Sequence, residues 1–247
     1  MVSTATAVEA VLYLCEEDRK AAAMTDALLS ELLIVDLSNG IAGAYCCLLF
    51  GHLGAEVVRV DAPNSPQPEK AGLDAGKKSI TLDPSTPGGA TLLRRLAEHA
   101  DVLVVDEALP AGLDYAALSR QNPRLILTRI ANSSSGEFAA CFAGLNAFAA
   151  TMLPLVNMAI LGRGQEVEVD GGECLAAAAF VVDGMEAEGR PPAGEGSGSL
   201  RPPPFSMLGL APLAPAASPG EHNDEVYCGL LGLSDEELGR LREASII

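Results

Sequence analysis

The chain of 247 residues has no tryptophan, few aromatic residues and little positive charge. Lysine and arginine number 16 against 33 aspartate and glutamate residues, so the formal net charge is −17 at pH 7. A surface of this sign repels nucleic acid and anionic lipid, which excludes both as expected partners. The length is sufficient for one substantial hydrophobic core.

Long apolar runs and paired cysteines are also lacking. The apolar runs are interrupted by Gly, Pro or charge well short of a membrane span, and the first twenty residues lack the basic region of a signal peptide. The six cysteines form no C-x-x-C pair, which favours reduced thiols in a cytoplasmic protein over a disulfide framework or a zinc site. They are Cys15, Cys46, Cys47, Cys141, Cys174 and Cys228.

Residues 32–63 are the clearest structural unit in the sequence. An apolar run at 32–37 predicts a strand buried on both faces, and it is followed by a loop that contains Gly40. Residues 42–53 are predicted to form a helix, and 56–60 repeat the apolar, β-branched pattern of a strand. Two such strands around one helix predict a right-handed parallel βαβ unit.

Further strands are predicted to begin near residues 79, 101, 124 and 165. Together they predict an α/β fold class: a doubly wound, mainly parallel, Rossmann-like sheet with helices on both faces. In the last of these strands Glu166, Glu168 and Asp170 alternate with valines, which is typical of a strand with one solvated face. With no histidine nearby, we predict no metal site there.

Local signals predict where several helices begin and end. Thr86 followed by Pro87 predicts a capped helix start, and Ser234 with Glu237 three residues later predicts a capping box. Residues 142–161 predict a long apolar helix that Pro154 should kink or interrupt.

Seven blocks of sequence, in the same order, resemble signature blocks of the family III CoA-transferases. This family includes formyl-CoA transferase, carnitine CoA-transferase and α-methylacyl-CoA racemase. The blocks are DLS-x-x-x-AG (36–43), LGAEVVRVDAP (53–63), GKKSITLD (76–83), TPGGATLLRRLAEHADVLV (86–104), NPRLI (122–126), GRGQEVEVD (162–170) and GEHNDEVYCGLLGLSDEEL (220–238).

The resemblance implies a division of the chain into four parts. Residues 1–31 would be an N-terminal helical extension, and 32–188 a CoA-transferase-like large domain. The Pro/Gly/Ser-rich residues 189–219 would be a linker in place of the family's small second domain, which is largely missing. Residues 220–247 would form a C-terminal helical tail.

The resemblance also implies a site for the phosphates of coenzyme A or acyl-CoA, and no covalently bound cofactor. Backbone amides at a helix start favour anions, and two lysines would assist as point charges. The residues are Ser38, Asn39, Gly40, Ala42, Gly43, Lys77 and Lys78. Where the family has Asn-Phe-Arg-Pro-Gly after an acid, this chain has two acids, Asp106 and Glu107, and neither the arginine nor the aromatic residue. The negative charge there opposes CoA binding.

No catalytic residue is assigned. In the family an aspartate attacks the acyl-CoA carbonyl to form a mixed anhydride, and its position falls here at Ala139, Ala140 or Cys141. Glu137 is the nearest acid. Cys141 stands between apolar residues, a context that favours a small buried side chain over an activated thiol.

Three functions compete on this sequence. The first is a CoA-transferase or the related racemase, with little or no activity of the isolated chain. The second is a non-catalytic subunit that self-associates or pairs with a full-length homologue, using surface that includes the apolar helix 142–161. The third, ranked last, is a nucleotide-dependent oxidoreductase with Gly40 and Gly43 at the phosphate and Asp61 at the ribose.

Overall fold

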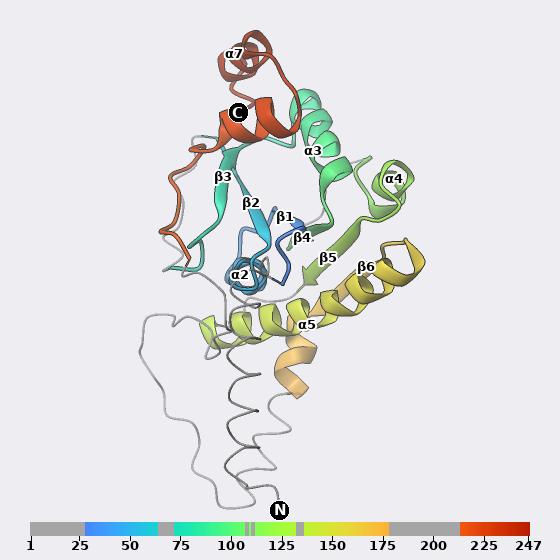
Figure 1. Ribbon diagram of the computed structural model, residues 1–247. Helices are drawn as coiled ribbons and strands as arrows, with labels where there is room; N and C mark the ends of the chain where they lie inside the picture. Colours follow the sequence, from blue (N-terminus) through green and yellow to red (C-terminus); the bar gives the residue numbers. More distant parts are fainter. Residues whose placement is uncertain (1–27, 64–71, 107–108, 110–111, 132–135, 178–212) are drawn as a thin grey trace, which may run out of the picture.

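A computed structural model describes residues 28–63, 72–106, 109, 112–131, 136–177 and 213–247 (Figure 1). Its centre is one six-stranded sheet in the order β3-β2-β1-β4-β5-β6, in which every neighbouring pair is parallel. The predicted doubly wound α/β fold is confirmed, with β1 at the centre of the sheet. The strands are β1 (Leu33–Asp36), β2 (Glu56–Asp61), β3 (Lys78–Thr81), β4 (Val102–Val105), β5 (Ile126–Ala131) and β6 (Glu166–Asp170).

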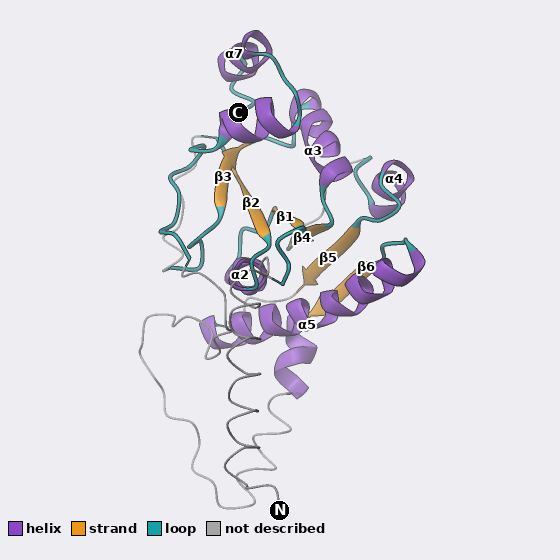
Figure 2. Cartoon of the chain, in the orientation of Figure 1, coloured by secondary structure: helices purple, strands orange, loops and turns teal. Residues whose placement is uncertain are grey.

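Helices cover both faces of the sheet (Figure 2). They are α2 (Ile41–His52), α3 (Pro87–His99), α4 (Tyr115–Gln121), α5 (Glu137–Leu161), the π-type turn η1 (Glu225–Leu230) and α7 (Asp235–Glu243). A further helical stretch occupies residues 171–177. One face carries α2 and α5, and the other carries α3, α4, η1 and α7.

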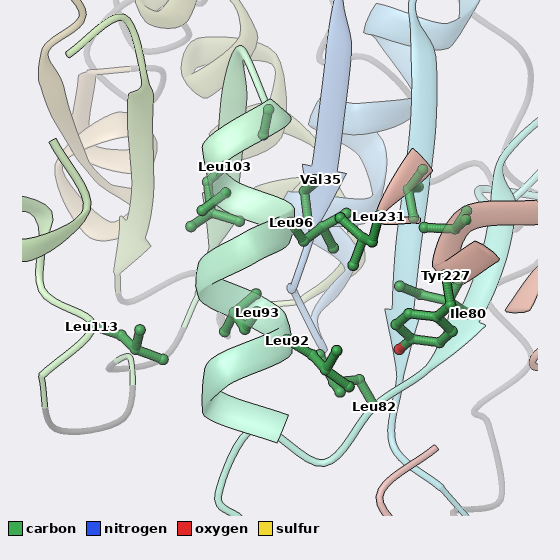
Figure 3. Packing of buried hydrophobic residues seen from close by; sticks show 14 of the residues in the cluster. Val35, Ile80, Leu82, Leu92, Leu93, Leu96, Leu103, Leu113, Tyr227 and Leu231 are labelled. Carbon is green, nitrogen blue, oxygen red and sulfur yellow. The ribbon is translucent and has the colours of Figure 1, made fainter. Parts of the chain in front are cut away.

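Strand alternation divides the core into two layers. Ile34 and Val104 point to the α2–α5 side, whereas Val35 and Leu103 point to the α3 side. Figure 3 shows the second layer, in which the leucine-rich inner face of α3 packs on the sheet together with Tyr227 of η1. Because both faces of the central strands are covered, β1 and β4 consist of continuous apolar runs rather than alternating ones.

The predicted helix starts are confirmed, whereas the prediction that Pro154 could interrupt the helix is wrong. The Thr86 side chain accepts a hydrogen bond from Gly89 N, and Ser234 and Glu237 form the complete capping box of α7. Pro154, however, lies inside α5, which runs unbroken for 25 residues. Leu155 and Met158 pack in the core beyond the proline, and this burial outweighs the local cost of about 3 kcal/mol.

The continuity of α5 also overturns the expectation that every apolar run falls short of a membrane span. By length and composition α5 could cross a membrane. However, 44% of its most apolar window is buried within the fold, and a single helix of this kind is weak evidence for a membrane span.

The C-terminal residues return to the sheet and close the edge at β3. His222 N donates to Ser79 O while its Nδ1 accepts from Ser79 N, and Asn223 pairs through its side chain with Thr81. Gly76 N donates to the carbonyl of Ala214. The predicted N-terminal extension up to residue 27, and the predicted linker up to residue 212, lie outside the described residues, so the division into four parts stays a prediction.

Candidate functional site

The candidate site lies where the order of the strands reverses, between β1 and β4. In sheets of this kind, ligands bind in the crevice beyond the carboxyl ends of these two strands. Here β1 leads into residues 37–40 and then into α2, while β4 ends at Val105 and is followed by Asp106. The loop predicted to receive CoA phosphates therefore stands at the expected place in the fold.

The carboxylate of Asp106 accepts hydrogen bonds from two backbone amides of this loop. Asn39 N and Gly40 N donate to Asp106 Oδ2 at 2.9 and 2.5 Å. Gly40 is the N-cap residue of α2 and has no side chain to cap the helix, so Asp106 supplies the cap from β4. The other oxygen, Asp106 Oδ1, is buried without a hydrogen-bond partner among the described residues. The positive end of α2 is thus occupied by a carboxylate in the position that suits a phosphate.

Three other predicted CoA-binding residues shape the loop. Ser38 donates from N and Oγ to Asp36 Oδ1, at 3.0 and 2.5 Å. A Cβ on Gly43 would lie 2.2 Å from Ser38 Cβ, so only glycine lets α2 start this close to the loop. Ala42 is fully buried where α2 crosses α5.

Lys77 belongs to a buried network of charges beneath the loop. Its Nζ lies 2.9 Å from Asp36 Oδ2 and 3.2 Å from Asp74 Oδ1, and it donates to Ala44 O at 3.0 Å. Burial opposes the charge of Lys77, but Asp36, Cys47 and Asp74 together outweigh it, so the pKa of Lys77 is raised. Its ammonium therefore links Asp36 at the end of β1 to the carbonyl of Ala44 in the first turn of α2, beneath the loop.

The network continues through Arg59. Its guanidinium contacts Asp74 and Asp61, each at 2.7 Å, and Ser79 Oγ donates to Asp61 Oδ2 at 2.6 Å. Asp61 is thus buried and engaged, which removes the free ribose-binding acid that a nucleotide-dependent oxidoreductase would need. Sequence reasoning did not find this network, although an arginine within the apolar strand 56–61 signals a buried partner.

Lys78 lies on the other side of the sheet. Neighbouring strand residues point to opposite faces, and Lys78 Nζ pairs with Glu56 at 2.7 Å and with Glu225 of η1 at 2.8 Å. The structure therefore does not bring the two lysines together at the loop. Whether either contacts a phosphate stays a prediction.

The positions that align with the catalytic aspartate lie in the first turns of α5. Ala139 and Ala140 are buried, and Cys141 is half-buried. Burial, and then the nearby Glu137 carboxylate, raise the pKa of the Cys141 thiol to about 11. It is therefore protonated at neutral pH and a weak nucleophile. Glu137 is exposed at the first position of the helix.

The remaining thiols and acids offer no alternative centre in the described part of the chain. Cys46 and Cys47 are fully buried, and the five described cysteines are free. The outer face of β6 carries Glu166, which lies 3.4 Å from Arg129. Within the described ranges no group of three His, Cys, Asp or Glu side chains is placed to hold a metal ion.

The model of CoA-transferase family III matches residues 29–132. Over 117 residues the chain is 39% identical to α-methylacyl-CoA racemase from Homo sapiens, covering 44% of this chain and 30% of that protein. Over 121 residues it is 31% identical to succinyl-CoA–D-citramalate CoA-transferase from Chloroflexus aurantiacus, covering 41% and 30%. These matches span about three tenths of the length of the relatives.

Solved structures agree on the fold. A CAIB/BAIF family protein from Brucella suis aligns with a TM-score of 0.58 at 24% identity, over 68% of this chain and 60% of its own. The protein Rv3272 from Mycobacterium tuberculosis aligns with a TM-score of 0.58 at 20% identity, over 67% and 60%. The match at residues 29–132 contains β1 to β5, the loop after β1 and Asp106, and over these residues the chain is similar to CoA-transferase family III.

Proposed function

We propose that the chain binds acyl-CoA at the carboxyl ends of β1 and β4, for transfer of CoA between an acyl-CoA and a carboxylic acid. One observation carries this proposal: the family match at 29–132 includes the loop that precedes α2, and that loop stands at the strand-order reversal. Phosphates would approach the amides of Asn39 and Gly40 and compete there with Asp106.

Two variants of this function have support from particular relatives. The similarity to α-methylacyl-CoA racemase favours a racemase-like reaction on an acyl-CoA. The similarity to the alpha and beta subunits of succinyl-CoA–L-malate CoA-transferase from Chloroflexus aurantiacus favours a subunit of a heteromeric enzyme. The isolated chain would then have reduced activity or none.

Low activity of the isolated chain is expected from the residues at the start of α5. CoA transfer by the family's route needs a carboxylate that attacks the acyl carbonyl, forms a mixed anhydride and releases the CoA thiolate. Ala139 and Ala140 carry no such group, and Cys141 keeps its proton at neutral pH. A full-length homologue would supply the aspartate, in a heteromer or mixed oligomer. The free thiols of the five described cysteines are in keeping with a cytoplasmic location.

Binding and turnover are tested separately. Thermal unfolding is followed with CoA, acetyl-CoA, succinyl-CoA and, as a control, NAD, because a ligand that binds only the folded state raises the melting temperature. We expect CoA compounds to raise it and NAD to leave it unchanged. No shift with any CoA compound would overturn the binding proposal, whereas a shift with NAD alone would favour the oxidoreductase.

Turnover is measured with the same donors and several carboxylate acceptors, first with the isolated chain and then with a full-length homologue added. We expect no transfer by the chain alone. Robust transfer by the isolated chain would contradict the expectation of low activity and would direct attention to Glu137, the acid nearest the family position.

A further inference from the structure

The outward side of α5 carries a continuous apolar surface, which we call the outer stripe. Its residues follow one another at intervals of three or four and so form one face of the helix. They are Phe138, Phe142, Leu145, Ala149, Leu153, Val156 and Ile160. Phe138 and Ile160 are 75% exposed and Leu153 is 73% exposed. No charged residue occurs between Phe138 and Leu161.

This surface exceeds what a monomer ordinarily leaves in water. The exposed parts of its side chains amount to on the order of 700 Å², above the ~300–600 Å² of the largest apolar patch on a typical monomer and near the ~800 Å² that each partner buries in a standard interface. The size of the stripe therefore indicates a protein interface.

A groove lies beside one end of the stripe. It has a volume of about 520 Å³ and separates the C-terminal half of α5 from residues 28–32. Its walls are mainly leucine and methionine side chains, including Leu29 and Met152, and Val156 belongs to both the groove and the stripe. Arg124 lies on its polar side.

The other end of the stripe carries a pair of stacked aromatic side chains. The ring of Phe138 stacks on that of Phe142, with centroids 6.4 Å apart and an angle of 14° between the planes. This aromatic pair stands near the start of α5, and the groove lies near its end. A ridge at one end and a groove at the other fit each other when two copies of α5 run antiparallel.

Antiparallel pairing about Ala149 gives an apolar partner to each residue of the stripe. Phe138 faces Ile160 of the second copy, Phe142 faces Val156, and Leu145 faces Leu153. Both aromatic rings then lie over the groove of the second copy. Each contact occurs twice, as the two-fold symmetry of a closed dimer requires.

The charges at the two ends of α5 agree with this orientation. Glu137 is exposed at the first position of α5, and Arg163 is exposed just after its last residue. Antiparallel pairing brings Glu137 of one copy near Arg163 of the other. Parallel pairing would instead place like charges together. The opposed helix dipoles also favour the antiparallel arrangement.

We infer that two copies of this chain associate through the outer stripe of α5, antiparallel, with the Phe138–Phe142 pair seated in the groove of the other copy. The inference is independent of the proposed function, because it uses neither the loop before α2 nor any CoA contact.

The test is the molar mass by light scattering over a range of protein concentrations. The wild-type chain should be a dimer, and Leu153→Glu should weaken dimerisation by on the order of 30-fold or more, because it buries two unpaired carboxylates. Leu230→Glu, at a 37% exposed leucine of η1 outside the stripe, is the matched control and should remain dimeric. Circular dichroism checks that both variants are folded.

A charge exchange tests the orientation. Glu137→Arg alone should weaken the dimer, and Glu137→Arg combined with Arg163→Glu should restore it, because the opposite charges meet again. A monomeric wild-type chain overturns the inference, and so does a Leu153→Glu variant that remains a dimer. Binding of a monomeric wild-type chain to neutral phosphatidylcholine vesicles, lost in Leu153→Glu, would also overturn it and assign the stripe to lipid.

Discussion

Gly40 donates its backbone N–H to Asp106 Oδ2 at 2.5 Å, and this bond joins the first turn of α2 to the end of β4. The two residues are 66 positions apart and meet at the reversal of strand order. The same carboxylate also accepts from Asn39 N. Asp106 therefore stabilises the start of α2 and places a negative charge where an anionic ligand of this fold binds. Its two effects, on stability and on ligand binding, have opposite signs.

The first prediction separates these effects with Asp106→Asn, which keeps an oxygen acceptor for the two amides but removes the charge. The melting temperature should fall, and the free energy of unfolding should decrease by on the order of 1 kcal/mol, as is typical of a weakened helix cap. The affinity for CoA should rise roughly five- to tenfold, because a like charge near the phosphates costs on the order of 1 kcal/mol at a partly exposed site. Calorimetric titration with CoA measures the second effect.

Asp114→Asn is the matched control. Asp114 Oδ1 caps α4 by accepting from Ala117 N at 2.7 Å, well away from the loop in the chain. This variant should lose comparable stability and keep the wild-type affinity for CoA. Equal or weaker CoA binding by Asp106→Asn would mean that Asp106 does not compete with the ligand.

Elements whose signals are local were predicted well from the sequence. The strand β1 follows from an uninterrupted apolar run that ends at polar residues and glycine, and the inner face of α3 follows from the spacing of its leucines. The start of α7 follows from Ser234 and Glu237, which are only three residues apart. In each case the determining contacts lie within one element.

Contacts made by the folded sheet were not predicted. Lys77 and its partner Asp36 are 41 residues apart in the chain, and only the parallel arrangement of strands brings them together. The separation of Lys77 from Lys78 follows from strand alternation once β3 is known to begin at Lys78. Pro154 does not end the helix, because the packing of α5 on the sheet, which no local pattern records, outweighs the cost of the proline.

The second prediction compares these adjacent lysines. Lys77→Met should lower the free energy of unfolding by on the order of 3–5 kcal/mol, because it removes the buried cation that pairs with Asp36 and leaves Asp74 to Arg59 alone. Lys78→Met should cost at most about 1 kcal/mol, since its pairs with Glu56 and Glu225 are partly exposed. Urea denaturation of both variants decides the matter. Similar losses would show that the buried network does not distinguish the two positions.

The third prediction concerns alkaline pH. Burial, and to a lesser extent the Asp36 carboxylate, raise the pKa of the Cys46 and Cys47 thiols, and the pKa of Lys77 is also raised. A raised pKa contributes stability that is complete below the unfolded value and is lost as the pH rises toward the folded value. The free energy of unfolding should therefore begin to fall above about pH 8.5, where the thiols of the unfolded chain ionise. It should fall further above about pH 10.4, where the lysine of the unfolded chain loses its proton.

A variant with Cys46→Ala and Cys47→Ala isolates the contribution of the thiols. Between about pH 8.5 and 10 its stability should decline less steeply, by up to ~1.4 kcal/mol per pH unit for each thiol removed. Urea denaturation at a series of pH values gives both slopes. Parallel curves for the variant and the wild-type chain would show that these thiols ionise as readily in the folded state as in the unfolded one.

The fourth prediction concerns the crossing of α2 and α5, which fixes the start of α2 and hence the loop before it. A Cβ on Gly144 would lie 2.3 Å from the Ala42 carbonyl oxygen, so Gly144→Ala must push the two helices apart. The expected loss is about 1–3 kcal/mol, as for other overpacked sites. Gly239 in α7 has no atom within 4 Å of the added Cβ, so Gly239→Ala should instead stabilise the protein by up to ~1 kcal/mol. The melting temperature and the urea midpoint should therefore fall for Gly144→Ala and rise for Gly239→Ala. A Gly144→Ala variant with unchanged or increased stability would contradict the close approach of α2 to α5.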